Sequence, residues 1–222
     1  MGKGRLRQFY GSMVGKKVVM GVTGLIGIGF VIVHSLGNLL VFRGPDAINS
    51  YSRFLKSTGE LLWALRIVLI IAVVLHVIAA IQLTRQSRAA RPIGYVKHET
   101  QAATVASRTM RWGGALLLVF IIVHILHFTT GTIRPAGSFS HQGVYANVVT
   151  SFRIWWVSLI YIVSMIALGY HLFHGAWSSV RSIGVSPASP EPLHHRISLV
   201  LAILIWAAFT AIPVAVFTGF VR

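Results

Sequence analysis

Five long apolar stretches constrain the fold of this 222-residue chain more than any other feature of its sequence. They run over about 18–42, 61–83, 112–130, 154–180 and 197–221. Each is long enough to cross about 30 Å of hydrocarbon as an α-helix and too continuously apolar for a barrel strand. Because a bilayer offers no water to the backbone, the sequence predicts an all-α integral membrane bundle of five transmembrane helices, forming one domain over 1–222.

Composition narrows the chemistry that such a bundle can carry. Hydrophobic residues make up 55% of the chain and charged residues 11%, which fits an integral membrane protein. The first apolar stretch is longer than the core of a signal peptide, so we predict a retained helix. The chain has no cysteine, which excludes iron–sulfur clusters, thiolate-bound haem and disulfides within it. A redox centre here would have to be histidine-bound or organic.

The distribution of positive charge predicts the orientation. Most of the 20 lysine and arginine residues lie in the amino-terminal segment and in the connections after the second and fourth helices. By the positive-inside rule, the amino terminus is cytoplasmic and the carboxyl terminus lies outside. The formal charge of +16 fits either contact with anionic lipid or docking of an acidic soluble subunit. Nucleic acid is not an expected partner, since the charge lies in loops of a membrane bundle.

Four histidines lie within the apolar stretches, where an imidazole commonly holds a ligand, a metal or a proton path. At about 1.5 Å per residue, His34 and His124 fall in the outer half of the membrane, and His76 and His171 in the inner half. Two depth-matched pairs from separate helices are the arrangement needed to ligate two stacked haems through axial imidazoles. The alternative for any single histidine is an interhelical hydrogen bond.

Two further histidines leave the choice of ligand open on the third and fourth helices. His127 follows His124 by three residues, and His174 follows His171 by three, so each pair shares roughly one helix face. Depth alone does not separate the members of either pair. Small residues also flank the histidines, and we expect Gly24, Gly27 and Gly37 around His34, although such residues are common at any close helix contact in membranes.

The chain resembles the five-helix, two-haem, single-subunit cytochrome b membrane anchor of succinate:quinone oxidoreductases, the succinate dehydrogenase and fumarate reductase family. The resemblance covers nearly the whole chain. It is carried by Lys16-Lys17, Thr23-Gly24-Leu25, His34 with Gly37-Asn38, His76, Met110-Arg111-Trp112, Val123-His124, and His171 followed by Gly175, Trp177 and Gly184. It implies that the outer haem is held by His34 and His124 and the inner haem by His76 and His171, with His127 and His174 as neighbours.

The resemblance also implies cofactors, partners and a location. Such an anchor would hold two haem b groups and bind a flavoprotein subunit and an iron–sulfur subunit on the cytoplasmic side of a bacterial-type inner membrane. It would pass electrons between those subunits and membrane quinone, with menaquinone favoured, while succinate chemistry stays on the partners. Both a single copy and a higher oligomer of the complex are compatible with the sequence.

Candidates for contacting a quinone or a haem propionate lie near both membrane surfaces. On the outer side they are Asn38, Glu60 and Arg66, and on the inner side Lys17, Thr23, Arg108, Arg111 and Trp112. Each also has a plain explanation, because Trp112 suits an interfacial belt and long basic side chains reach toward headgroups. No carboxylate lies within a predicted span, so Glu60 at the start of the second helix is the candidate proton donor for outer quinone chemistry.

Two other functions remain open on the sequence alone. One is the quinone-reactive two-haem cytochrome b of another dehydrogenase, of the hydrogenase or formate dehydrogenase type. The other is a non-redox transporter that moves protons or substrate through histidine relays. Haem spectra and the identity of co-purifying subunits distinguish the three readings.

Overall fold

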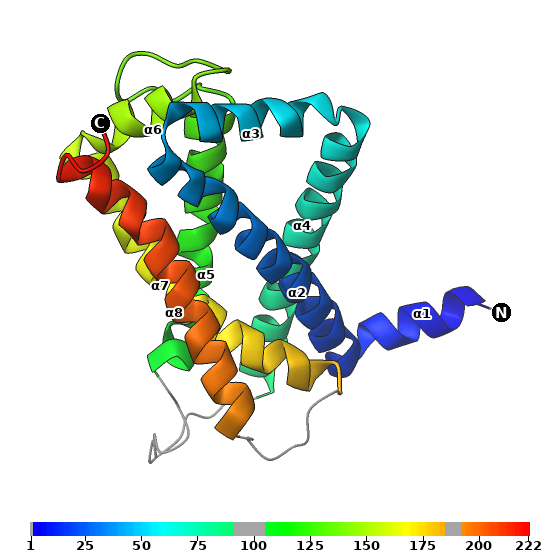
Figure 1. Ribbon diagram of the computed structural model, residues 1–222. Coiled ribbons are helices and arrows are strands. Elements are labelled where there is room, and N and C mark those ends of the chain that lie inside the picture. The colour runs from blue at the N-terminus through cyan, green and yellow to red at the C-terminus, as the bar shows by residue number, and fades with distance from the viewer. Residues whose placement is uncertain (1, 91–104, 185–191) are drawn as a thin grey trace.

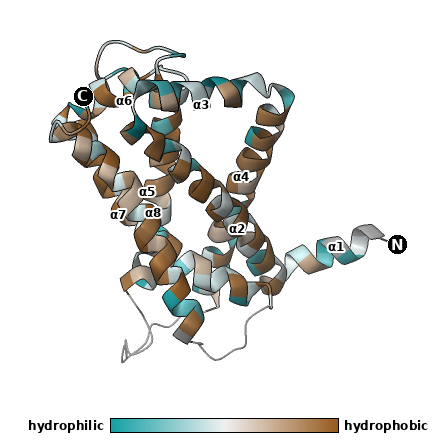
Figure 2. Ribbon diagram, in the orientation of Figure 1, coloured by the Kyte–Doolittle hydropathy of each residue, from teal (hydrophilic) through white to brown (hydrophobic). Residues whose placement is uncertain are grey.

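The computed structural model describes residues 2–90, 105–184 and 192–222, and these parts form helices and connecting turns (Figure 1). Five of the helices are long and apolar enough to cross a membrane, so the protein is a multi-pass membrane protein and the predicted all-α five-helix bundle is confirmed. They are α2 (Met13–Asn38), α4 (Glu60–Ala89), α5 (Val105–His124), α7 (Trp155–Ser182) and α8 (Pro192–Phe217). Figure 2 shows the apolar colour concentrated along them.

Several spanning helices extend beyond the predicted apolar stretches. Helix α2 begins at Met13 rather than near residue 18, and α4 continues to Ala89 rather than ending near residue 83. The extension of α4 carries Arg85, Gln86 and Arg88, which are good helix formers outside the hydrocarbon. Hydropathy marks only the part of a helix that lies in lipid, so helix ends in the headgroup region are missed.

Three shorter helices were not predicted, because they lie in the segments that the sequence assigns to the amino terminus and the connections. They are α1 (Gly2–Gly11), α3 (Pro45–Ser57) and α6 (Val144–Phe152). Helices α3 and α6 pack against each other and lie across the end of the bundle that also holds the carboxyl terminus (Figure 1). We call this the capped end. The amino terminus lies at the opposite end, as an odd number of spans requires.

Helix α7 is the centre of the bundle, since α2, α5 and α8 all pack against it. Helix α4 packs mainly on α2. Only 11% of the most apolar part of α4 and of α5 is buried by the rest of the chain, against 33% in α7 and in α8. Most of the surface of α4 and α5 is therefore available to lipid, a cofactor or another subunit.

The main core lies at the capped end, where the cap meets α7 and α8. It consists of Val41, Ile48, Val148, Val149, Phe152, Val157, Tyr161, Ile212, Ala215, Val216 and Val221. Pro213 lies inside α8 and lacks the N–H that would bond to the carbonyl of Phe209. Cap and spans thus share one apolar interior, which fixes the capped end.

Two connecting turns are helical but not α-helical. A 3-10 segment, η1 (Leu39–Arg43), follows α2 and leads into α3. A π-helical segment, η2 (Ile125–Thr129), directly continues α5. Turns of the π type occur mostly as short insertions and are frequent at functional sites. Segment η2 begins immediately after His124, one of the four candidate ligands.

Candidate functional site: two histidine pairs

The four intramembrane histidines meet in the two pairs that depth arithmetic predicts. His34 of α2 and His124 of α5 have ring centroids 5.9 Å apart, with their planes at 83°. His76 of α4 and His171 of α7 have ring centroids 6.2 Å apart, with their planes at 60°. We call the first the capped pair, since it lies toward α3 and α6, and the second the basal pair. Each pair joins helices that are distant in the sequence.

The spacing within each pair suits two axial ligands of one metal ion. A first-row metal lies about 2 Å from an imidazole nitrogen, and each ring centre lies about 1 Å behind that nitrogen. Two imidazoles on opposite sides of one ion therefore have centres roughly 6 Å apart. The observed 5.9 and 6.2 Å fit this value. Interplanar angle is not restrictive, because each ring can rotate about its bond to the metal.

The described residues contain no group of three or more His, Cys, Asp or Glu side chains that could hold a bare metal ion. A metal bound only by protein would need about four such ligands, as zinc does in structural sites. Two histidines suit a metal ion whose remaining ligands come from a macrocycle, as in haem. The donor set therefore fits haem iron better than a free cation.

Hydrogen bonds fix the ring of His76 in a form suited to a metal ligand. Its Nδ1 lies 3.1 Å from the carbonyl oxygen of Met20 and 3.2 Å from the hydroxyl of Thr23. A carbonyl only accepts, so Nδ1 carries the hydrogen and Nε2 keeps its lone pair. Metal-binding histidines typically donate their second N–H in this way. Thr23, a predicted candidate, is thus placed beside the basal pair.

The partner ring, His171, has a buried Nδ1 with no hydrogen-bond partner among the described residues. Gly114 of α5 lies against this ring: a Cβ built there would be 3.6 Å from Cε1 and 4.0 Å from Nδ1 of His171. Gly24 of α2 lies similarly against His76, with a built Cβ 3.4 Å from its Cε1. Two glycines thus keep side chains away from the basal pair, and an unpaired nitrogen remains beside it.

The expectation that three glycines surround His34 was wrong, since a Cβ built on Gly27 has no neighbour within 4 Å and the other two face different residues. Gly24 faces His76 instead, and a Cβ at Gly37 would meet the ring of Tyr51 on α3 at 2.6 Å. In a helix that is apolar all round, no hydrophobic period marks the face that each glycine occupies. The ring of His34 is instead flanked by Phe30, stacked at 5.1 Å, and by Phe209 at 5.7 Å.

Asn38 lies against the capped pair, as its place one turn after His34 suggests. Its amide nitrogen donates to the His34 carbonyl at 2.7 Å and lies 3.3 Å from the Nε2 of that ring. A metal at Nε2 would require the amide to keep only its bond to the carbonyl. Of the outer candidates, Asn38 is the one that the structure places on a histidine.

The remaining candidates lie elsewhere. Lys17, Glu60, Arg108, Arg111 and Trp112 are exposed, and Trp112 reaches 82%. Arg66 stacks on Trp63, with its guanidinium 5.1 Å from the ring centre. Such exposed positions near helix ends fit interfacial roles. The buried lysine is Lys16, which the sequence analysis did not choose, and its Nζ donates to the Gly11 carbonyl at 2.9 Å.

The two neighbouring histidines have different surroundings. His127 is only 4% exposed and has hydrogen-bond contacts at both ring nitrogens, with Tyr161 and Ser151. His174 lies 6.0 Å from the ring of Trp177, centre to centre. Neither meets a histidine of another helix in the way the four candidate ligands do. Residue type and depth could not reveal this, since they do not fix rotation about the helix axis.

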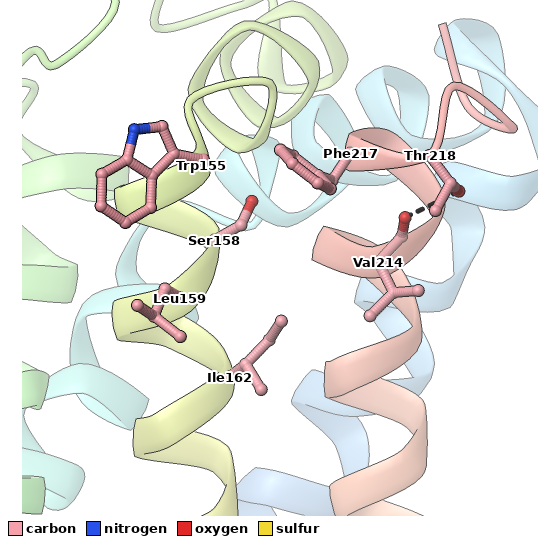
Figure 3. Close-up of a pocket in the computed structure, with 7 residues that line it drawn as sticks. All are labelled: Trp155, Ser158, Leu159, Ile162, Val214, Phe217 and Thr218. Carbon is pink, nitrogen blue, oxygen red and sulfur yellow. Dashed lines mark hydrogen bonds between the residues drawn. The ribbon is translucent and has the colours of Figure 1, made fainter.

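A groove lies between α7 and α8 (Figure 3). It has a volume of about 280 Å³ and is lined by Trp155, Ser158, Leu159, Ile162, Val214, Phe217 and Thr218. Its hydroxyls are engaged, since Ser158 donates to the Phe152 carbonyl at 2.6 Å and Thr218 to the Val214 carbonyl at 2.8 Å. An apolar groove whose two hydroxyls are both engaged suits a lipid chain rather than chemistry.

The chain matches no protein-family model, no curated protein and no solved structure. Functional inference therefore depends on the two histidine pairs and on the resemblance carried by the sequence motifs.

Proposed function

We propose that this protein is the di-haem cytochrome b membrane anchor of a succinate:quinone oxidoreductase. The observation that carries the proposal is the meeting of four intramembrane histidines in two pairs with centroid distances of 5.9 and 6.2 Å. Haem bound by two histidines supplies one-electron transfer and has no free axial position for oxygen. The chain's own contribution is to hold each histidine pair in a dry, apolar setting.

The arrangement of the pairs supports transfer across the membrane. The capped pair lies toward one end of the bundle, and the basal pair includes residues of α4 and α7 nearer the other end. Under the predicted orientation, the basal pair faces a cytoplasmic iron–sulfur subunit with its flavoprotein partner. The exposed basic residues Lys17, Arg108 and Arg111 suit an acidic docking surface on that side. Localisation in a bacterial-type inner membrane is part of the proposal.

For quinone, we propose a site beside one of the two pairs. Asn38 at the capped pair and Thr23 at the basal pair are the polar candidates that contact a histidine. Glu60 is exposed at the start of α4 and would supply protons from the capped end. Glu60→Gln should slow turnover with reduced menaquinone analogues while leaving haem spectra intact, and unchanged turnover would exclude this role.

Haem content of the purified chain tests the proposal directly. Dithionite-reduced difference spectra should give two b-type haems per chain. His34→Ala or His124→Ala should remove one haem, and His76→Ala or His171→Ala the other, while the matched control His174→Gln should retain both. Absence of haem would refute the proposal and favour a histidine-relay transporter. Co-purification with a hydrogenase or formate dehydrogenase subunit would favour another dehydrogenase instead.

A further inference from the structure

A buried series of hydrogen-bonded polar side chains leads away from the capped pair. The hydroxyl of Tyr161 on α7 lies 3.5 Å from Nδ1 of His124 and 3.0 Å from Nδ1 of His127. The Nε2 of His127 lies 2.9 Å from the hydroxyl of Ser151 on α6. Tyr161 is 7% exposed, His127 4% and Ser151 5%, so water reaches little of this series of side chains. It joins a spanning helix to the cap.

The π-helical segment η2 carries His127, one member of this series of side chains. The wider turn is closed by a bond from the Thr130 N–H to the Ile125 carbonyl at 3.0 Å. Both histidines of this helix approach one tyrosine, with centroid distances to the Tyr161 ring of 6.0 Å for His124 and 5.8 Å for His127. A π turn gives up regular helix bonding, so its position beside a candidate ligand points to a role there.

His127 is suited to support a ligand and not to be one. Both of its ring nitrogens already have hydrogen-bond contacts within the protein, and a metal would have to displace one of them. Breaking such a bond in a buried site leaves an unpaired polar group, which is costly. His124 differs, because its contact with Tyr161 is through Nδ1 and leaves Nε2 as the nitrogen for a metal.

The direction of the hydrogen bonds follows once Nε2 of His124 binds a metal. Its Nδ1 then carries the hydrogen and donates to the Tyr161 oxygen. Tyr161 has one hydrogen, which it donates to Nδ1 of His127, so Nε2 of His127 is protonated and donates to Ser151. Every group has a consistent role in this order. In the reverse order, His124 would carry its hydrogen on Nε2 and could not bind a metal.

We propose that Tyr161, held by His127 and Ser151, positions and polarises His124 as an axial ligand of the haem at the capped pair. This inference rests on the proposed function. An acceptor on the second nitrogen of a histidine fixes its ring and raises its basicity, and losing such a partner commonly costs 10- to 100-fold in metal affinity or activity. Tyr161 and His127 are positioning residues, since they act through His124.

The test is a redox titration of the purified holoprotein carrying Tyr161→Phe, with His127→Gln and His127→Leu as a conservative and an apolar replacement. A less basic ligand stabilises the oxidised iron less. A tenfold loss of affinity confined to the oxidised state raises the midpoint potential of that haem by about 59 mV for one electron. The haem at the basal pair serves as an internal reference. Ser158→Ala, one turn before Tyr161, is the matched control.

We expect Tyr161→Phe and His127→Leu to raise the potential of one haem and to alter its low-spin electron paramagnetic resonance signal, with His127→Gln recovering part of the change. Loss of that haem alone, with the other retained, has the same meaning. Unchanged potential and signal in Tyr161→Phe, or an equal change at both haems, would overturn the inference. If the unmodified protein holds two haems but the Tyr161→Phe variant shows no such change, the inference fails and the proposed function stands. If the unmodified protein holds no haem, both the inference and the proposed function are refuted.

Discussion

Adjacent glycines in α5 offer a sharp test of the packing around the basal pair. A Cβ built on Gly114 lies 3.6 Å from Cε1 of His171, whereas a Cβ on Gly113 has no neighbour within 4 Å. A single methyl fits at either position, since 3.6 Å is ordinary contact. A leucine does not fit equally well at both positions. Its outer carbons would meet His171 at position 114 but open space at position 113. We therefore expect Gly114→Leu to be the damaging change.

The magnitude follows from these contacts. Forcing extra carbons into a packed site costs about 1–3 kcal/mol, which Gly114→Leu should show. Both leucines gain helix propensity over glycine by a similar amount, which cancels in the comparison. Gly113→Leu also places an apolar side chain toward lipid, at a gain of about 0.3–0.6 kcal/mol. The two variants should therefore differ by roughly 1–4 kcal/mol, and each 1.4 kcal/mol is about a tenfold change in the folding equilibrium.

Unfolding in mixed micelles with increasing SDS, followed by tryptophan fluorescence, measures this difference. Gly114→Ala should unfold near the midpoint of the unmodified protein, and Gly114→Leu at clearly lower SDS than Gly113→Leu. If the two leucine variants unfold together, His171 does not occupy the space beside Gly114 in solution, and the argument for the basal pair loses its geometric basis.

Further predictions concern the cap. Asn147→Ala removes a bond to the Ser140 N–H at 2.9 Å and one to its carbonyl at 2.7 Å, at about 0.5–1.5 kcal/mol each. Hydrogen exchange at the Ser140 amide should speed up by roughly tenfold, and an unchanged rate would show that the loop is held elsewhere. Gly37→Ala would put a Cβ 2.6 Å from Tyr51 Cε1, so the Tyr51 ring or the helix α3 that carries it must shift and stability should fall by about 1–3 kcal/mol. Adding Tyr51→Ala should restore part of that loss, as melting curves of the double variant would reveal.

Much of the spanning architecture was predictable because lipid imposes a strong rule on the backbone. Apolar length gave the number of spans, and a constant rise per residue gave the depth of each histidine. Depth was enough to match the second spanning helix with the fourth and the first with the third, but not to choose His124 over His127 or His171 over His174. The short helices of the cap were not predicted. A polar segment that begins with proline, such as Pro45–Ser57, looks like a connecting loop in the sequence, because the surface it packs against is not known.

Rotation about helix axes was the information that the sequence lacked. A helix surrounded by lipid has no polar face, so the side on which Gly24 or His127 lies is not encoded in a hydrophobic period. The π turn after His124 adds a local change of register that propensity does not reveal. Contacts such as that of His127 with Tyr161 and Ser151, or of Asn38 with His34, therefore needed the structure.

The order in which the two pairs appear along the chain has a consequence for biogenesis. The two pairs interleave along the chain, because His76 lies between His34 and its partner His124. During synthesis, His34 is therefore made well before His124, and His76 well before its partner His171. The first two spans can insert as a hairpin of α2 and α4, yet neither pair is complete until later spans arrive. Both pairs also straddle the connection between α4 and α5. Separately expressed halves of the chain should thus each lack a complete pair, and if the proposed haems are present, their loading should be a late, post-insertion event that requires both halves.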